Sequence, residues 1–190
     1  MPTKKIAILI GGSDLILGMR GLSAGTRIIV KSIDQHFDEV IAINYNYFLD
    51  FNTTLKKTEK IIASQDENTK IFLYGYSKGG DVVLKLSRLL VNKREIELLI
   101  TVDVANGPWS HKINRHVPAN VKHNINVFQS TPSPPLRSYG LATFSDAGVV
   151  IQNIDLTNEI IASQKVNHRM IERLVADDII SWLISFSRTI

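Results

Sequence analysis

Six short apolar runs, separated by longer amphipathic or polar stretches, set the fold class of this 190-residue chain. The apolar runs lie at residues 6–10, 40–43, 71–74, 98–102, 121–129 and 149–154, and stretches typical of helices lie at 24–36, 54–64, 77–91 and 168–186. Apolar strands that alternate with helices are typical of a mainly parallel sheet buried on both faces. We therefore expect an α/β fold, a three-layer α/β/α sandwich around about six strands.

The length and the lack of a linker or repeat predict a single domain over residues 1–190, without a large cap domain. Two long loops, 105–120 and 130–148, each follow a predicted strand, and the second is rich in Pro, Ser and Gly. Parallel sheets carry their functional crevice outside the carboxyl ends of the strands. Both loops are expected to lie over that edge of the sheet.

Composition excludes several classes of protein. The chain has no cysteine, which rules out disulfides, a Cys nucleophile and Cys-ligated metals, and favours a cytoplasmic location. The first apolar run has five residues, fewer than the roughly 7–15 of a signal peptide, and no run approaches the ~18 of a membrane span. The net charge is +4 and the pI is about 9.3, but basic and acidic residues are interspersed, so no nucleic-acid partner is expected. Nothing in the pattern indicates an oligomeric state.

The third apolar run leads directly into Gly75-Tyr76-Ser77-Lys78-Gly79-Gly80, and a helical stretch follows at once. Gly-x-Ser-x-Gly between a strand and a helix forms a sharp turn that presents the serine hydroxyl outward. The glycines allow strand and helix to pass closely, and the helix N-terminus favours a developing negative charge. The motif predicts Ser77 as a nucleophile. The alternative is a glycine-rich turn in which Ser77 caps the helix.

This segment resembles the nucleophile elbow of the α/β-hydrolases, the family of lipases, esterases and thioesterases. Gly-Tyr-Ser-Lys-Gly is also similar to the elbow of small cutinase-like esterases. The resemblance covers the order of elements along most of the chain, and only the elbow is specific. It implies hydrolysis of a small-molecule ester or thioester through an acyl-enzyme, with no metal or organic cofactor.

In this family the nucleophile, the acid and the histidine base follow in that order along the chain. His168 lies just before the last predicted helix and is the only histidine after residue 123, so it is the candidate base. Asp103 directly follows the run 98–102 and is the preferred acid, with Asp146 and Asp155 as alternatives. The acid would fix the tautomer of the imidazole and stabilise its protonated form.

The resemblance also implies an oxyanion hole made of backbone N–H groups. One donor should be Lys78, the residue after the serine, and the other should come from the loop after the first strand, from Gly12 or Ser13. An apolar substrate group is expected, and the candidate substrate-binding side chains are Trp109, Tyr76 and Tyr139.

Two other functions fit parts of the sequence. A strand followed by a glycine-rich loop can hold a phosphate, but the glycines after residue 10 do not form Gly-x-Gly-x-x-Gly, and no Gly-Lys-Ser/Thr follows them. The second alternative is a hydrolase-fold protein that binds a ligand or partner without turnover. The first loop lacks the His-Gly often found in the family, and the acid comes one strand early, which leaves this alternative open.

Overall fold

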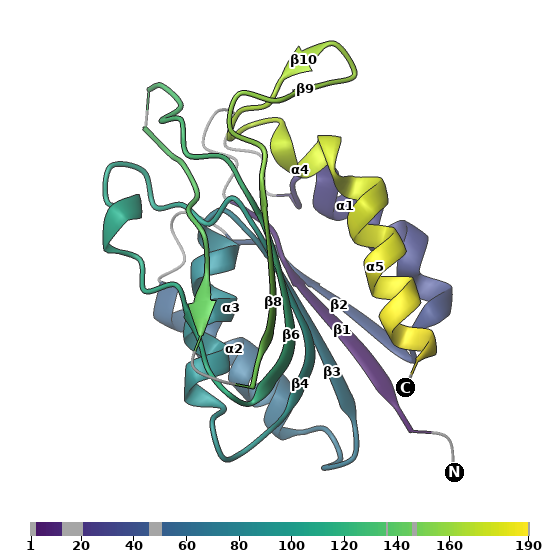
Figure 1. Cartoon of the computed structure of the whole chain (residues 1–190). Coiled ribbons are helices and arrows are strands. Elements are labelled where there is room, and N and C mark those ends of the chain that lie inside the picture. The colour runs from purple at the N-terminus through teal and green to yellow at the C-terminus, as the bar shows by residue number, and fades with distance from the viewer. Residues whose placement is uncertain (1–2, 13–20, 46–50, 136, 146–147, 190) are drawn as a thin grey trace.

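A six-stranded sheet forms the centre of the computed structural model, which describes residues 3–12, 21–45, 51–135, 137–145 and 148–189 (Figure 1). The strand order is β2-β1-β3-β4-β6-β8, and every neighbouring pair is parallel. The strands are β1 (Lys5–Ile10), β2 (Glu39–Ile43), β3 (Lys70–Tyr76), β4 (Ile96–Val102), β6 (Val121–Phe128) and β8 (Val150–Asp155). The predicted number and direction of the main strands are confirmed.

Helices cover both faces of the sheet (Figure 1). One face carries α1 (Ala24–Ile33), α4 (Ile171–Leu174) and α5 (Ala176–Arg188), and the other carries α2 (Phe51–Ala63) and α3 (Lys78–Leu89). Right-handed crossovers explain this division, because the chain moves from β1 to β2 in one direction and from β2 through β3 to β4 in the other. No helix within the described ranges is long and apolar enough to cross a membrane.

The core follows the alternation of side chains along β1. Ile6, Ile8 and Ile10 pack with residues of α2 and α3, whereas Ala7 and Leu9 pack with residues of α1 and α5. All five are at most 1% exposed, as expected for a central strand covered on both faces. Burying two opposite rows of one strand in this way requires helices on both sides of the sheet.

Two helices differ from their predicted ranges. The stretch 24–36 is α1 followed by the short 3₁₀ helix η1 (Asp34–His36). The stretch 168–186 is divided into α4 and α5, and His168 lies in the turn before α4, which agrees with its expected position just before the last helix. Because this histidine lies in a turn and not in a helix, contacts with other segments can set the orientation of its ring.

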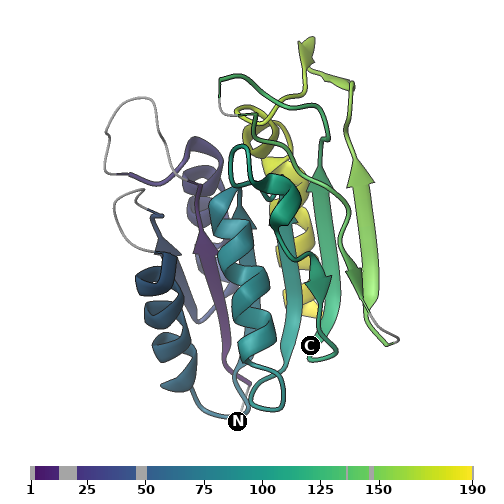
Figure 2. The same ribbon diagram turned by 90° about the vertical axis from the view of Figure 1, so that its left-hand side faces the viewer.

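The connection between β6 and β8 contains no helix in its described part. Residues 138–145 instead run as non-helical chain on the face of the sheet that also carries α3 (Figure 2). Polar side chains hold this segment. Asn126 donates to the Leu141 carbonyl at 3.1 Å, and Asn153 exchanges hydrogen bonds of 2.9 Å with the backbone of Thr143. Asn126 is fully buried and Asn153 is exposed, so the segment is held by one amide in the core and one at the surface.

Four short strands and a second 3₁₀ helix complete the described structure. The strands β5 (His116–Val117) and β7 (Phe144–Ser145) pair with each other, and β9 (Ile160–Ile161) forms a hairpin with β10 (Gln164–Lys165). The 3₁₀ helix η2 spans Ser110–Lys112. None of these elements was predicted, because two or three residues carry no readable period.

The strand register brings the carboxyl ends of the central strands together. Ile10 of β1 pairs with Gly75 of β3, and Val102 of β4 pairs with Tyr76 of β3 and with Val127 of β6. The chain reverses its direction of progress across the sheet between β1 and β3, which is where open α/β sheets form their binding crevice. The residues that follow these four strands thus meet at one place.

Candidate active site

Ser77 occupies a strained turn between β3 and α3. Its φ is 55° and its ψ is −120°, a conformation that side-chain-bearing residues rarely adopt and that costs about 1–3 kcal/mol. Its N–H donates to the carbonyl of Val102 at 3.0 Å, which ties the turn to the neighbouring strand. The side chain makes no capping hydrogen bond to α3. The alternative in which Ser77 serves as a helix cap is therefore wrong.

The glycines of the turn are required by close packing. A Cβ on Gly79 would lie 2.1 Å from the carbonyl oxygen of Ile10, and a Cβ on Gly75 would lie 2.6 Å from both the Gly79 carbonyl oxygen and Val83 Cγ2. Neither position can hold a side chain without moving backbone. This confirms the prediction that the motif glycines let the strand and helix pass closely.

Ser77, His168 and Asp103 form a continuous series of hydrogen bonds. Ser77 Oγ lies 2.9 Å from His168 Nε2, and His168 Nδ1 lies 2.8 Å from Asp103 Oδ2. The side chain of His168 is 12% exposed and that of Asp103 is fully buried. A carboxylate only accepts, so Nδ1 carries the proton that it donates to Asp103. Nε2 is left to accept the proton of the serine hydroxyl.

Gln129 supports the Asp103 carboxylate and was not identified from the sequence. Its backbone N–H donates to Oδ1 at 3.2 Å, and its side-chain amide donates to Oδ2 at 3.1 Å. Asp103 itself has a φ of 43°. A Cβ on Gly140 would lie 2.4 Å from Asp103 Oδ1, so this position also requires glycine. Gln129 directly follows β6, just as Asp103 directly follows β4. This position at the carboxyl end of a strand could have identified Gln129 from the sequence.

The alternative acids lie elsewhere or outside the description. Asp155 is exposed at the end of β8, and its Oδ1 accepts the backbone N–H of Thr157 at 2.8 Å and the hydroxyl of the same residue. Asp146 lies outside the described residues. Asp103 is therefore the candidate that the structure brings to the imidazole.

His168 is held by side chains from two distant segments. The ring of Tyr76 stacks on the imidazole at a centroid distance of 5.5 Å, and the Tyr76 hydroxyl donates to the carbonyl of His168. The His168 N–H donates to Ser133 Oγ at 3.2 Å. Tyr76, expected from the sequence to contact substrate, thus contacts the histidine. The other two residues expected to contact substrate are Trp109 and Tyr139. Trp109 lies in the loop after β4 and is 57% exposed, and Tyr139 lies next to Gly140 and is half-buried.

The candidates for the two oxyanion donors are Lys78 for one, and Gly12 or Ser13 for the other. Lys78 is the first residue of α3, so its backbone N–H lies at the positive end of the helix dipole. A Cβ on Gly12 would lie 3.0 Å from Ser77 Cβ and 2.8 Å from the ring of Tyr76, so the Gly12 backbone lies against the serine. Ser13 lies outside the described residues. Burial lowers the pKa of the Lys78 ammonium, and nearby Asp81 opposes the effect.

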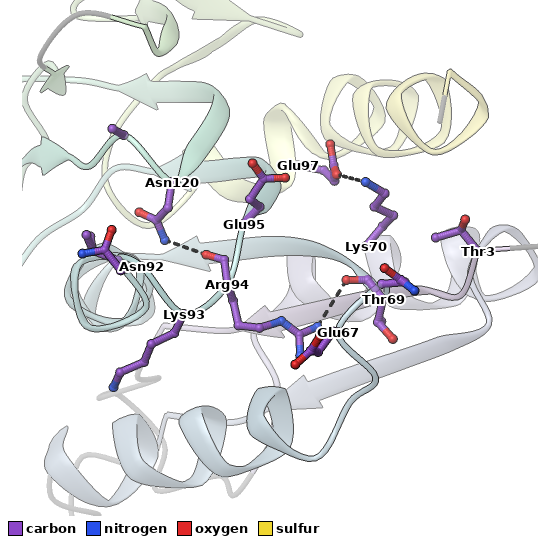
Figure 3. Close-up of a pocket in the computed structure, with 13 residues that line it drawn as sticks. Thr3, Glu67, Thr69, Lys70, Asn92, Lys93, Arg94, Glu95, Glu97 and Asn120 are labelled. Carbon is purple, nitrogen blue, oxygen red and sulfur yellow. Dashed lines mark hydrogen bonds and ion pairs between the residues drawn. The ribbon is translucent and has the colours of Figure 1, made fainter.

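A groove of about 830 Å³ lies at the opposite end of the sheet (Figure 3). Its lining includes Thr69 and Lys70 at the start of β3, Glu97 at the start of β4 and Asn120 before β6. At about 3.3 Å per residue, a seven-residue strand such as β3 separates this groove from Ser77 by roughly 20 Å. The groove therefore has no part in the Ser77 site. No cluster of three acidic, His or Cys side chains that could hold a metal ion occurs among the described residues.

Neither a family model nor a curated protein sequence matches this chain. Solved structures do match it. A putative hydrolase from Agrobacterium vitis S4 superposes with a TM-score of 0.60 at 12% identity, covering 96% of this chain and 88% of the other. A cutinase-like protein from Cryptococcus sp. gives 0.53 at 13% identity, covering 98% and 94%. The surfactin thioesterase domain SrfTE gives 0.52 at 11% identity, covering 95% and 92%.

These proteins are similar to this chain along nearly its whole length. Sequence identities this low are evidence for a shared fold and for nothing more specific. The chain therefore has the α/β-hydrolase fold.

Proposed function

We propose that this protein is a serine hydrolase that cleaves a carboxylic ester or thioester through an acyl-enzyme formed on Ser77. The observation that carries the proposal is the pair of hydrogen bonds, 2.9 Å and 2.8 Å, that joins Ser77 to His168 and His168 to Asp103. A serine hydroxyl becomes a competent nucleophile when an adjacent imidazole accepts its proton. The names of the similar structures, a cutinase-like protein and a thioesterase domain, support ester and thioester chemistry.

In the first half of the reaction, His168 Nε2 takes the hydroxyl proton while Ser77 Oγ bonds to the substrate carbonyl carbon. Asp103 accepts from Nδ1 throughout and stabilises the imidazolium that forms. The tetrahedral intermediate then expels the alcohol or thiol, which receives the proton from Nε2. In the second half, a water molecule gives its proton to Nε2 and attacks the acyl carbon. The carboxylic acid leaves and the proton returns to Ser77 Oγ.

The negative charge on the tetrahedral oxygen needs donors that are fixed in advance. We assign this role to the backbone N–H of Lys78 and to a backbone N–H of the loop that contains Gly12 and Ser13. The position of Gly12 against Ser77 Cβ supports the choice, since only a residue without a side chain fits there. The positive end of α3 adds to the stabilisation.

The substrate is expected to carry an apolar acyl or aryl group. Trp109 supports this choice, because a large aromatic side chain that is 57% exposed is available for an apolar ligand. The loops 105–120 and 130–148 would form the rim of the site, with Tyr139 on the second. A single domain over residues 1–190 and a cytoplasmic location are predictions that accompany this proposal.

Turnover of activated esters tests the proposal. The wild-type protein should release p-nitrophenolate from short- and medium-chain p-nitrophenyl esters with an initial burst, since such activated esters acylate a serine faster than water hydrolyses the acyl-enzyme. It should also hydrolyse a thioester of the same acyl chain. Ser77→Ala should abolish both, whereas Ser64→Ala, which removes a hydroxyl bonded to the Ile61 carbonyl at the end of α2, should leave them unchanged.

Two results would contradict the proposal. Activity retained in Ser77→Ala would assign it to another group or to a contaminant. Saturable binding of esters without any turnover would instead support the alternative of a hydrolase-fold protein that binds without catalysis.

A further inference from the structure

Glu172 is a buried carboxylate that the proposed reaction does not use. It is the second residue of α4, four positions after His168, and it is 3% exposed. A buried carboxylate destabilises the fold unless hydrogen bonds compensate. Burial raises the pKa of Glu172, and hydrogen bonds from Thr26, Tyr74 and Ser23 oppose that rise. An apolar residue could fill the same space without this penalty. The use of a glutamate here therefore indicates a role for its hydrogen bonds.

Three hydroxyl groups surround one oxygen of this carboxylate. The hydroxyls of Thr26, Tyr74 and Ser23 lie 2.6, 2.8 and 2.9 Å from Glu172 Oε1. Ser23 directly precedes α1 and Thr26 lies in its first turn, so the carboxylate also lies at the positive end of that helix. A Cβ on Gly25 would lie 2.5 Å from Glu172 Cγ, which shows how closely α4 approaches α1. Glu172 thus fastens the start of α4 to α1 and to β3.

The same strand holds both ends of the segment from His168 to Glu172. Tyr74 and Tyr76 are two residues apart on β3, so their side chains project from the same face of the sheet. Tyr74 donates to Glu172, while Tyr76 donates to the His168 carbonyl and stacks on its ring. β3 ends at the residue before Ser77. The strand that delivers the serine therefore also anchors the turn that delivers the imidazole.

We propose that Glu172 is a positioning residue that holds His168 within hydrogen-bonding distance of both Ser77 and Asp103. This inference rests on the proposed function. The imidazole must satisfy two contacts at once, at 2.9 Å and 2.8 Å, and its own turn is not part of a helix. A displacement of about 1 Å in such an arrangement can lower the rate about 100-fold. The hydroxyl cluster around Glu172 fixes the far end of that turn.

The test replaces Glu172 with Leu and with Gln and compares both with a control at the other end of the sheet. Glu97 is the matched control, because it is also a buried glutamate, 4% exposed, and lies at the start of β4 far from Ser77. Glu172→Leu should lower kcat and the rate of fluorophosphonate labelling about 10- to 100-fold with little change in KM. Glu172→Gln retains an oxygen that accepts the hydroxyls and should recover most of the rate. Glu97→Gln should reduce thermal stability but keep both rates.

A spectroscopic readout covers the case in which Glu172→Leu folds poorly. The proton on His168 Nδ1, bonded to Asp103, should give a downfield NMR resonance that Asp103→Asn eliminates. Tyr74→Phe removes one hydroxyl donor to Glu172 and should shift or broaden this resonance, whereas Glu97→Gln should not.

The outcomes separate the two claims. If the wild type is labelled at Ser77 and the Glu172 and Tyr74 variants keep its labelling rate, kcat and resonance, the positioning role is wrong and the proposed function stands. If the wild type is neither labelled nor active, the proposed function fails and this inference falls with it.

Discussion

The two ends of the central sheet each bury a glutamate, and the pKa values of these two glutamates are shifted in opposite directions. At the amino end, Glu97 accepts from Lys70 at 2.7 Å and from Lys122 at 2.9 Å (Figure 3 shows the Lys70 contact). Burial opposes ionisation of Glu97, but the hydrogen bonds from the two lysines outweigh it and lower its pKa. At the carboxyl end, Glu172 is surrounded by hydroxyls instead of cations, and its pKa is raised. The hydrogen bonds of Glu97 outweigh the effect of its burial, whereas those of Glu172 do not.

Backbone conformation shows the same difference. The carboxyl end contains Ser77 with a φ of 55° and Asp103 with a φ of 43°. The amino end has a positive φ at Asn92, a residue type that adopts this conformation readily. Arg94 at that end donates to the carbonyls of Gln65 and Asp66 beyond the last turn of α2, a favourable place for a cation. Two of the three proposed catalytic residues thus have a strained backbone, as is typical of functional sites.

The largest expected effect is that of Asp103→Asn. An amide at this position can present its NH2 to the imidazole and favour the wrong tautomer, so kcat should fall about 10⁴-fold. Steady-state kinetics with an activated ester measure the change. Asp155→Asn is the control, since that carboxylate bonds to Thr157 and not to His168. A loss of less than tenfold in Asp103→Asn would mean that the acid had been misassigned.

Gly79→Ala should have the next largest effect, on stability. The added methyl would overlap the carbonyl oxygen of Ile10 at 2.1 Å, and overpacking of this kind typically costs about 1–3 kcal/mol or more. Gly21→Ala is the control, because a Cβ there meets nothing within 4 Å. Urea unfolding monitored by circular dichroism compares the two. Equal midpoints for Gly79→Ala and the wild type would show that strand and helix are not in close contact.

The pH dependence of stability should differ in sign for the two buried glutamates. Glu97 has a lowered pKa, so its contribution is present above the ordinary value of 4.5 and is lost as the pH falls through its folded value. Glu172 has a raised pKa, so its ionised form destabilises the fold at neutral pH, and stability recovers as the pH falls from its folded value to 4.5.

Replacing each by Gln and measuring unfolding free energy between pH 3 and pH 8 tests these signs. Relative to the wild type, Glu97→Gln should be least stable at neutral pH, and the deficit should shrink on acidification. The relative stability of Glu172→Gln should be greatest at neutral pH and decline on acidification. The same slope for both variants would remove the contrast between the two ends.

The smallest effect is expected at the rim of the groove. Lys93 Nζ lies 3.7 Å from Glu59 Oε1, and the two side chains are 62% and 36% exposed. Exposed ion pairs contribute less than about 1 kcal/mol. Lys93→Ala should therefore change the free energy of unfolding by less than that, and a thermal melt at low and moderate salt checks it. A larger loss would show that the amino end depends on this pair.

Local patterns explain what the sequence could predict. The alternation of apolar runs and helices indicated the layered sheet, and Gly-x-Ser-x-Gly after a strand indicated the turn at Ser77. The carboxyl ends of parallel strands lie at one edge of the sheet, so the position of Asp103 directly after its strand indicated it as the acid. Each of these inferences needs only neighbouring residues and the general geometry of parallel sheets.

Contacts between distant residues were not predictable in this way. Glu172 and Thr26 are 146 residues apart, and a glutamate in an amphipathic stretch looks like a solvated helix residue. The Pro- and Gly-rich segment 130–148 was expected as a loop, yet Asn126 and Asn153 fasten its described part to the sheet. Asparagines two residues apart on β6, at 124 and 126, were the available signal, because amides facing a core need polar partners.

The central claim is that the Ser77 hydroxyl is activated by His168. Intact-mass measurement after treatment with a fluorophosphonate, followed by peptide mapping, tests it most directly. We predict one adduct per chain on Ser77, lost in Ser77→Ala and formed far more slowly in His168→Ala. An unmodified wild-type protein, or labelling at the same rate without the imidazole, would contradict the account.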